Sequence, residues 1–386
     1  MKLRKYLIFA LAGLTALGTA LTVWGRKSDH ATVHATTAAT AGMVVGTPGI
    51  KSAGALTFGP DNILFIGDSQ GATVFAIAIK DDAKDAAESP IKIDNLDRKI
   101  ASLLGTTPEA IVINDMAVHP ASQNVYLSVS RGRGNDAVPV LLRATKRGVI
   151  EEVALKDVLF SKVAIDNALE PGAKDYWGID GRKMTITDLA FADGELLIAG
   201  LSNAEFASTL RRAPFPFKQE MATSSLEIYH TSHNRYETQS PIETFLPFTI
   251  HGQPSLLAGY GCAPIAAFSL SEIKSKKHLR GTTLAELGGG NRPLDMIAFE
   301  KEGKKRILIA NSNRTLISMS AEDIEKATPL TKPVTAAYVS AGVPYLSIAE
   351  VGVTQLDNLN GKFVVIIQRN IDDGSLNLHS LSKGWL

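Results

Sequence analysis

Cysteine is nearly absent from this chain, since Cys262 is the single one among 386 residues. Intramolecular disulfides are therefore excluded, and so is a covalently attached c-type haem, which needs a Cys-x-x-Cys-His motif. The lone cysteine also lies far from the N-terminus, so it cannot carry the lipid anchor of a lipoprotein. A large apolar core must supply the stability that disulfides give to many exported proteins.

An excess of charge is missing too, because 40 Lys and Arg residues nearly balance 39 Asp and Glu residues. Residues 1–35 hold five of the basic residues and one acidic residue, which leaves the rest of the chain with a net charge of −3. A mildly acidic body does not suit the phosphate backbone of a nucleic acid, so we expect no nucleic-acid partner.

The N-terminus combines a basic start with an apolar run. Three basic residues among the first five precede the run from Tyr6 to Trp24, and these are the two parts of a secretory signal. We therefore expect a periplasmic or secreted protein and assign residues 1–35 to a signal peptide. The run is nearly as long as the ~20 residues that span a bilayer, so an N-terminal membrane anchor is the alternative, and only then is the membrane a partner.

Residues 293–319 show a pattern that recurs along most of the chain. The segment contains three short apolar strands, with a charged turn between the first two and a polar stretch after the second. Units of the same order begin at Ala55, Asp115, Asp188, Asp295 and Gln355, and a divergent one lies near Phe245. Recurrent three-strand units indicate the blades of a β-propeller, whereas a β-sandwich would not explain the repeat.

The spacing of these units predicts the architecture. Neighbouring units begin 60 or 73 residues apart, except for 107 residues between Asp188 and Asp295, which fits two blades. We predict an all-β fold, a six-bladed β-propeller over residues 54–386, with seven blades as the alternative. Short helical insertions are expected at 95–105 and 156–176. Residues 36–53 are predicted to form a linker and a closing strand that pairs with the C-terminus.

In such a blade, the start of the first strand and the residues after the second strand lie on one face, beside the central channel. The polar residues at these points are the predicted ligand-binding residues: Asp115, Asp188, Asp295 and Gln355 at strand starts, and Asp68, Arg131, Asn203, Asn311, Asn313, Arg314 and Arg369 after second strands. Carboxylates with amide oxygens suit a hard divalent cation such as Ca²⁺, so Asp115, Asp188 and Asp295 are the candidate metal ligands. No other cofactor is predicted. The alternative is that these aspartates accept hydrogen bonds from backbone amides of the adjoining blade.

Two second strands carry a family resemblance. Ile63-Leu-Phe-Ile-Gly-Asp-Ser and Arg306-Ile-Leu-Ile-Ala-Asn-Ser resemble the blade signature of NHL-repeat propellers and of the gluconolactonase and strictosidine synthase-like superfamily. The resemblance implies a propeller and, from the gluconolactonase-like enzymes, a divalent cation on the channel face. Ala55 stands where those enzymes have an acidic residue. We therefore expect a protein that binds a protein partner or a small ligand at the channel mouth, with a metal-dependent hydrolase of lactonase type as the alternative.

Two further features carry weaker expectations. His230 and His233 have a spacing seen in metal sites, but the sequence shows no third ligand beside them, so two exposed histidines are the alternative. The predicted loop of residues 201–223 carries Arg211 and Phe215, which would either cover a ligand as a lid or pack on their own blade.

Overall fold

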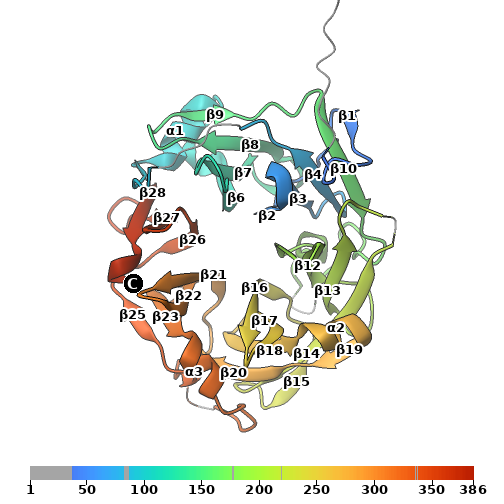
Figure 1. Ribbon diagram of the computed structural model, residues 1–386, viewed down its shortest axis with the longest axis vertical. Coiled ribbons are helices and arrows are strands. Elements are labelled where there is room, and N and C mark those ends of the chain that lie inside the picture. Colours follow the sequence, from blue (N-terminus) through green and yellow to red (C-terminus); the bar gives the residue numbers. More distant parts are fainter. Residues whose placement is uncertain (1–36, 82–86, 176–177, 219, 335, 337) are drawn as a thin grey trace, which may run out of the picture. The chain divides into compact units, whose positions relative to one another are not determined.

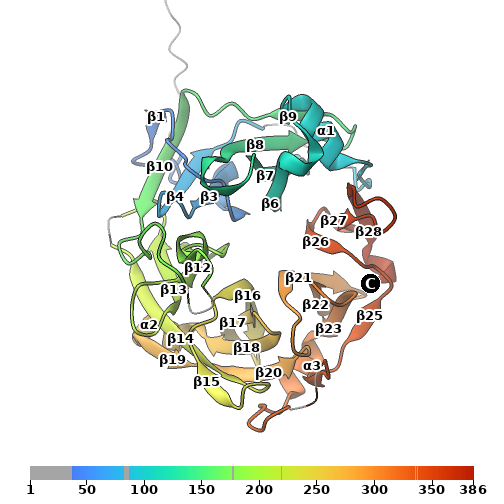
Figure 2. The ribbon, with the colours of Figure 1, turned by 180° about the vertical axis from the view of Figure 1, so that it is seen from behind.

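The computed structural model describes residues 37–386, apart from 82–86, 176–177, 219, 335 and 337. The predicted signal or anchor at 1–35 lies outside the described residues. Six sheets are arranged around a central channel, as Figures 1 and 2 show from opposite sides. The predicted six-bladed β-propeller is confirmed, and the seven-bladed alternative is wrong. Within the described ranges, no helix is long and apolar enough to cross a membrane.

We number the blades by the order of their first strands along the chain. Blade 1 contains β2 (Leu56–Phe58), β3 (Ile63–Asp68), β4 (Thr73–Ala78), β10 (Val158–Ala164) and β1 (Val44–Gly46). Blade 2 contains β6 (Ile111–Val118), β7 (Val125–Arg131), β8 (Val138–Ala144) and β9 (Ile150–Glu152). Blade 3 contains β11 (Asp188–Ala192), β12 (Glu195–Leu201), β13 (Ser208–Pro214), β14 (Ala222–His230), β15 (Arg235–Glu237) and β19 (His278–Arg280), which pairs with β14 in parallel.

In blades 4, 5 and 6, as in blades 1 and 2, all neighbouring strands pair in antiparallel orientation. Blade 4 contains β16 (Ile242–Ile250), β17 (Gln253–Tyr260), β18 (Pro264–Ser269), β20 (Thr282–Glu286) and β24 (Ala341–Gly342). Blade 5 contains β21 (Pro293–Lys301), β22 (Lys304–Asn311), β23 (Leu316–Ser320) and β25 (Leu346–Ile348). Blade 6 contains β26 (Val353–Asn358), β27 (Phe363–Arg369), β28 (Leu376–Ser382) and β5 (Lys92–Ile93).

Helices are short. The α-helices are α1 (Leu96–Leu103), α2 (Leu270–Ser275) and α3 (Ala321–Lys326), and the 3-10 helices are η1 (Pro60–Asn62), η2 (Pro108–Ala110), η3 (Gly134–Asp136), η4 (Gly181–Met184) and η5 (Lys383–Trp385). The predicted helical insertion at 95–105 is therefore confirmed as α1. The one at 156–176 is wrong in its main part, because residues 158–164 form β10.

Tight turns explain why the first two strands of three blades pair in register. Two residues with positive φ join these strands: Asp193-Gly194 in blade 3, His251-Gly252 in blade 4 and Glu302-Gly303 in blade 5. Such turns match the twist of a hairpin, and glycine at the second position adopts positive φ without strain.

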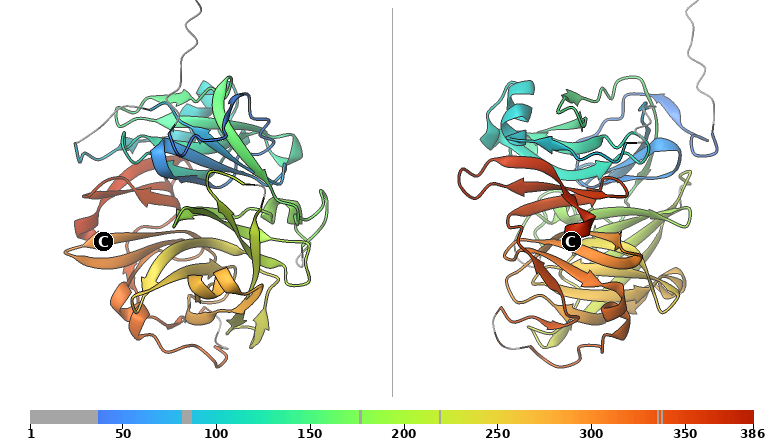
Figure 3. Two further views of the ribbon diagram at one scale, coloured as in Figure 1. Left: turned by 45° about the vertical axis from the view of Figure 1, so that its right-hand side comes forward. Right: turned by 60° about the vertical axis from the view of Figure 1, so that its left-hand side comes forward.

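The order of blades around the ring differs from their order in the chain. Six buried apolar clusters hold the ring together, and each lies between two blades: 1 and 2, 1 and 3, 3 and 4, 4 and 5, 5 and 6, and 6 and 2. Blade 2 therefore sits between blades 1 and 6, and blade 1 adjoins blade 3. Both views of Figure 3 show the red C-terminal blade beside the teal blade 2.

Two strands cross between distant parts of the chain to make this order possible. After blade 2, the chain returns to blade 1 as β10, which pairs with β4 and then with β1. The predicted pairing of residues 36–53 with the C-terminus is thus wrong, because Val44–Gly46 pairs with β10. The strand that joins the N-terminal part to the C-terminal blade is β5, whose Ile93 lies opposite Leu378.

Candidate functional site

Aspartates alternate with other residues around the channel. At the equivalent position near the start of the first strand, going around the ring from blade 1 through blades 3, 4, 5, 6 and 2, stand Ala55, Asp188, Thr244, Asp295, Gln355 and Asp115. Each aspartate thus faces a neighbouring blade that lacks one.

Each of these aspartates connects two blades through backbone amides. One carboxylate oxygen accepts from the next residue of its own strand, and the other accepts from the matching residue of the neighbouring blade. The amide donors are Met116 and Leu56 to Asp115 at 2.7 and 2.6 Å, Leu189 and Phe245 to Asp188 at 2.7 and 2.8 Å, and Met296 and Leu356 to Asp295, both at 2.7 Å. The three carboxylates therefore accept six amide hydrogen bonds, one from each blade.

The physical reason is the free edge of each first strand. The innermost strand has a sheet neighbour on one side only, so its channel-facing N–H groups need acceptors from elsewhere. Asp357 of blade 6 plays the same role two residues beyond Gln355, since it accepts from the amide of Asn358 at 2.6 Å and from that of Val118 of blade 2 at 2.7 Å. This geometry favours the blade-locking alternative for the aspartates.

The same carboxylates give the channel its electrostatic character. Asp115, Asp188, Asp295 and Asp357 line a cavity of about 390 Å³ that no Lys or Arg lines. Burial raises the pKa of Asp188 to about 7 and that of Asp357 to about 6. Burial and then repulsion between Asp115 and its neighbours raise the pKa values of Asp115 and Asp295 well above the usual range. Among the described residues, no three of these carboxylates bring oxygens within 4.8 Å of one another, as one small cation would require.

The other predicted residues mostly form hydrogen bonds within their blade or to the neighbouring one. Gln355 donates to the carbonyl of Asn114 at 3.1 Å, and Arg131 donates to that of Leu104 at 3.3 Å. Arg369 donates to the Gly374 carbonyl at 2.7 Å, and Asn203 is exposed. In blade 5, Asn311 is buried with its amide on the carbonyls of Ile309 and Thr315, Asn313 donates to Gly290, and Arg314 donates to Tyr345 and Tyr338.

Asp68 has a positioning role beside a polar hollow. It is 1% exposed and accepts from the amides of Lys51 at 2.8 Å, Ser52 at 2.9 Å and Gly71 at 2.8 Å. The carboxylate thereby fixes the segment that leads into blade 1 against the end of β3. Since its oxygens are engaged in this way, Asp68 holds Lys51 in place rather than offering itself to a ligand.

The hollow lies where blades 1, 2 and 3 meet. It encloses about 290 Å³, and its lining includes the three cations Lys51, Arg133 and Lys183 but no carboxylate. None of the three makes an ion pair within 4.0 Å among the described residues. The Arg133 Nε atom donates to the backbone carbonyl of Glu109 at 2.7 Å, and Arg133 also interacts electrostatically with the exposed Glu109 carboxylate. Sequence reasoning predicted the neighbouring Arg131 and Asp68 but missed both lysines. Both lysines come just before the first strand of a blade, Lys51 before β2 and Lys183 before β11, and this position is a signal that the sequence does carry.

The lining of this hollow includes a serine in a hydrolase-like pattern that was not singled out from the sequence. Gly67-Asp-Ser69-Gln-Gly71 fits Gly-x-Ser-x-Gly, the pattern of a nucleophile between a strand and a helix. Here the segment is instead a turn between two strands, β3 and β4. The Ser69 hydroxyl donates to the Ile186 carbonyl at 3.0 Å and accepts from the Ile186 amide at 3.2 Å. Ser69 thus links blade 1 to blade 3.

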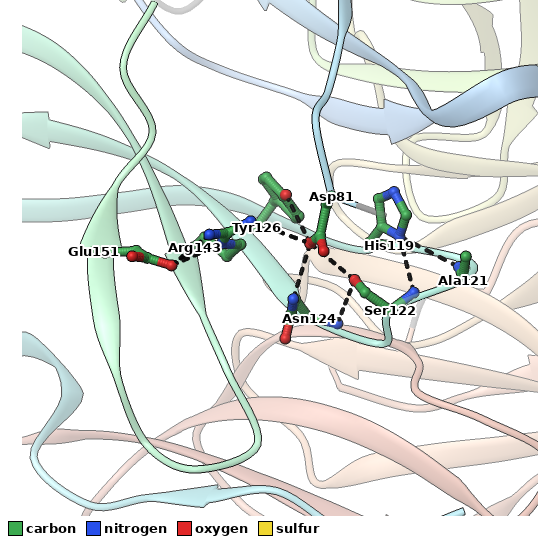
Figure 4. Close-up of polar contacts among 8 residues, drawn as sticks. All are labelled: Asp81, His119, Ala121, Ser122, Asn124, Tyr126, Arg143 and Glu151. Carbon is green, nitrogen blue, oxygen red and sulfur yellow. Dashed lines mark hydrogen bonds and ion pairs between the residues drawn. The ribbon is translucent and has the colours of Figure 1, made fainter. Parts of the chain in front are cut away.

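A second serine lies near a histidine and an aspartate in the cluster of Figure 4. The Ser122 hydroxyl donates to Asp81 at 2.9 Å, and the Nδ1 atom of His119 accepts from the Ser122 amide at 3.0 Å. Because Nδ1 is an acceptor, the neutral ring carries its proton on Nε2, and neither nitrogen can take a proton from Ser122. The three residues do not form a hydrolytic triad.

Asp81 instead ties the end of blade 1 to blade 2. Burial would raise its pKa, but hydrogen bonds from Asn124, Ser122 and Tyr126 hold the pKa of this carboxyl below its usual value. Arg143 lies 3.5 Å from the same carboxylate and pairs with Glu151 at 2.6 Å (Figure 4). The cluster is a structural network of hydrogen bonds and ion pairs.

The predicted lid is wrong, because residues 208–214 form β13 inside blade 3. Arg211 is fully buried, and its guanidinium donates to Asn167, to the carbonyl of Thr185 and to that of Leu201 at 2.8 to 3.0 Å. Phe215 packs edge-on against Phe65 of blade 1, with ring centroids 4.9 Å apart. The expected packing on their own blade holds for Arg211, whereas Phe215 packs across the boundary onto blade 1.

No protein-family model matches this chain, and no curated protein matches it. Among solved structures, the β-propeller domain of Cps50 (Swd1) from Myceliophteria thermophila is 10% identical with a TM-score of 0.35, over 86% of this chain and 83% of that one. An extracellular domain of a one-component system from B. thetaiotaomicron is 7% identical with a TM-score of 0.34, over 87% of this chain and 39% of that one. A chain of the mitotic checkpoint complex is 8% identical with a TM-score of 0.31, over 96% and 100%. The assignment of the fold rests on the six sheets alone.

Proposed function

We propose that the protein is a binding propeller that holds an anionic group in the hollow between blades 1, 2 and 3. The observation that carries the proposal is the set of three cations, Lys51, Arg133 and Lys183, that line one concave site without an ion-pair partner among the described residues. Cationic side chains around a hollow whose lining holds no carboxylate favour an anion in their midst. The anion is either a small molecule or an acidic segment of a protein partner.

Isothermal titration calorimetry at low salt tests this proposal with two kinds of probe. Citrate and inorganic phosphate represent small anions, and a poly-glutamate peptide represents an acidic protein segment. Replacement of Lys51, Arg133 or Lys183 with Gln should raise the Kd of the bound probe roughly tenfold, since a charge-assisted hydrogen bond contributes about 1.5–3 kcal/mol.

Lys305→Gln is the matched control, because Lys305 lines a separate hollow that blades 3 to 6 share. It should leave the Kd unchanged. Equal losses in all four variants would indicate general charge attraction and refute the site, as would absence of binding by every probe.

The alternative function, a metal-dependent hydrolase like the gluconolactonase-type propellers, has less support. It needs carboxylate oxygens free to hold a cation such as Ca²⁺. In Asp115, Asp188 and Asp295 both oxygens already accept backbone amides. A rise in Tm of the chelator-treated protein on addition of Ca²⁺, lost in Asp188→Asn, would restore this alternative.

We also propose that the protein is exported to the periplasm or secreted, on the basis of the basic and apolar N-terminal segment. Cell fractionation with N-terminal sequencing tests this. A mature N-terminus near Ala20 or Ala35 in the soluble exported fraction supports a cleaved signal, and an intact N-terminus in the membrane fraction supports the anchor.

A further inference from the structure

The hairpin of β14 and β15 brings three potential metal ligands together at the outer part of blade 3. In this hairpin His230 lies opposite Arg235 and Ile228 lies opposite Glu237. The residues between the strands form a turn in which the His233 amide donates to the His230 carbonyl at 3.2 Å. The turn folds His233 back toward the strands, so both histidines reach the same side chain, that of Glu237.

The three side chains converge closely. The His230 Nδ1 atom lies 2.7 Å from Glu237 Oε2, and the His233 Nδ1 atom lies 2.9 and 3.0 Å from the two Glu237 oxygens. One ligand atom from each residue falls within 4.8 Å of the others, a combination found nowhere else among the described residues. His230 is 2% exposed and Glu237 6%, whereas the His233 side chain is 38% exposed and leaves the cluster open to solvent.

The surroundings of the three ligands are acidic as well. Glu286 is 1% exposed, interacts electrostatically with both histidines, and accepts from the Thr231 hydroxyl at 2.7 Å. A second buried carboxyl group beside the cluster favours a cation there.

We propose that His230, His233 and Glu237 bind a divalent transition-metal ion such as Zn²⁺. Two imidazole nitrogens and one carboxylate are the donors that Zn²⁺ prefers, and three protein ligands leave a coordination position for water on the exposed side. In the metal-free form the two Nδ1–H groups donate to Glu237. When the ion binds, each imidazole loses its proton from Nδ1, to Nε2 of the same ring or to solvent, and the Nδ1 lone pair coordinates the ion.

Arg235 competes with the ion for Glu237. Its Nε atom donates to Glu237 Oε1 at 2.6 Å, and its side chain is 57% exposed. Removal of this competing cation should tighten metal binding. If the cluster only stabilised the hairpin through hydrogen bonds, Arg235→Ala would weaken the hairpin without increasing the affinity for metal.

The test uses the full chain after a chelator has removed bound metal. The protein is titrated with Zn²⁺ in a calorimeter and with Co²⁺ while visible absorption is recorded. We expect one equivalent to bind, His233→Ala and Glu237→Gln to weaken binding at least ~100-fold, and Arg235→Ala to bind as tightly or more tightly. His233 is the decisive site, since its exposure lets the variant fold.

The control is His278→Ala. His278 also lies beside a carboxylate that an arginine holds, with Nε2 3.4 Å from Glu227 and Arg280 2.6 Å from the same oxygen, but without a second histidine. This variant should bind Zn²⁺ like the unaltered protein. Absence of stoichiometric binding, binding that survives both His233→Ala and Glu237→Gln, or an equal loss in His278→Ala would overturn the proposal.

Discussion

Raising the pH from 5 to 8 should destabilise the propeller through its channel aspartates. Burial raises the pKa of Asp188 to about 7 in the folded protein, although the amides of Phe245 and Leu189 act in the opposite direction. The folded protein therefore binds a proton at Asp188 that the unfolded chain has already released. The stability from this proton is fully present below the unfolded pKa and is lost as the pH rises through about 7.

The size of the effect follows from the pKa values of Asp188 and Asp357, about 7 and about 6. A difference of one pKa unit corresponds to about 1.4 kcal/mol, so between pH 5 and 8 the free energy of unfolding should fall by ~3 kcal/mol through Asp188 and by ~1 kcal/mol through Asp357. Asp115 and Asp295 act in the same direction. His379 acts in the opposite direction, because burial lowers its pKa and its neutral form is favoured on folding.

Urea unfolding at pH 5, 6, 7 and 8 measures this dependence, and a variant removes one carboxylate. Asp188→Asn cannot titrate and also relieves the repulsion that raises the pKa values of Asp115 and Asp295. The difference in unfolding free energy between the two proteins should therefore change by at least ~3 kcal/mol over this range, while the His379 contribution cancels. The control is Asp193→Asn, at the exposed turn of the same hairpin, which should leave the pH dependence unaltered. A difference between the original protein and Asp188→Asn that does not vary with pH would refute the assignment.

Two further predictions concern groups that hold the blades together. Asp295→Ala should lower the free energy of unfolding by ~2–5 kcal/mol, because the amides of Met296 and Leu356 lose their acceptor. Gln355→Ala, at the equivalent position of blade 6, should lower it by only ~1 kcal/mol, and urea unfolding of both variants at one pH compares the two losses. Arg211→Lys should cost ~2–4 kcal/mol, because an ammonium cannot reach all three oxygens that the guanidinium holds, while Arg369→Lys at the surface should change the Tm little. Equal effects within either pair would contradict the corresponding assignment.

The blades were predictable from the sequence because the signals for them are local. Alternating apolar residues and two-residue turns such as Glu302-Gly303 specify each hairpin within a few residues, and α1 follows from its own apolar face. The order of the blades was not predictable, since it depends on where β5 and β10 join distant sheets.

The candidate sites were harder to predict for the same reason. Lys51, Arg133 and Lys183 belong to three blades, and they meet only because blade 1 lies between blades 2 and 3 in the ring. The His230 cluster is different, because the register of one hairpin creates it. Glu237 lies four residues beyond His233, so a prediction of the β14–β15 pairing would have supplied the third ligand.

The alternation of aspartates in the ring changes where a ligand site should be sought. In the sequence, Asp115, Asp188 and Asp295 recur at equivalent positions of three blades, and blades 1, 4 and 6 have no aspartate there. In the ring, each of those three blades adjoins an aspartate whose second oxygen reaches its amide. The number of channel aspartates is therefore set by the number of amides that need an acceptor. Side chains whose charge the fold does not use, such as Lys51 and Lys183, are the better guide to a bound molecule.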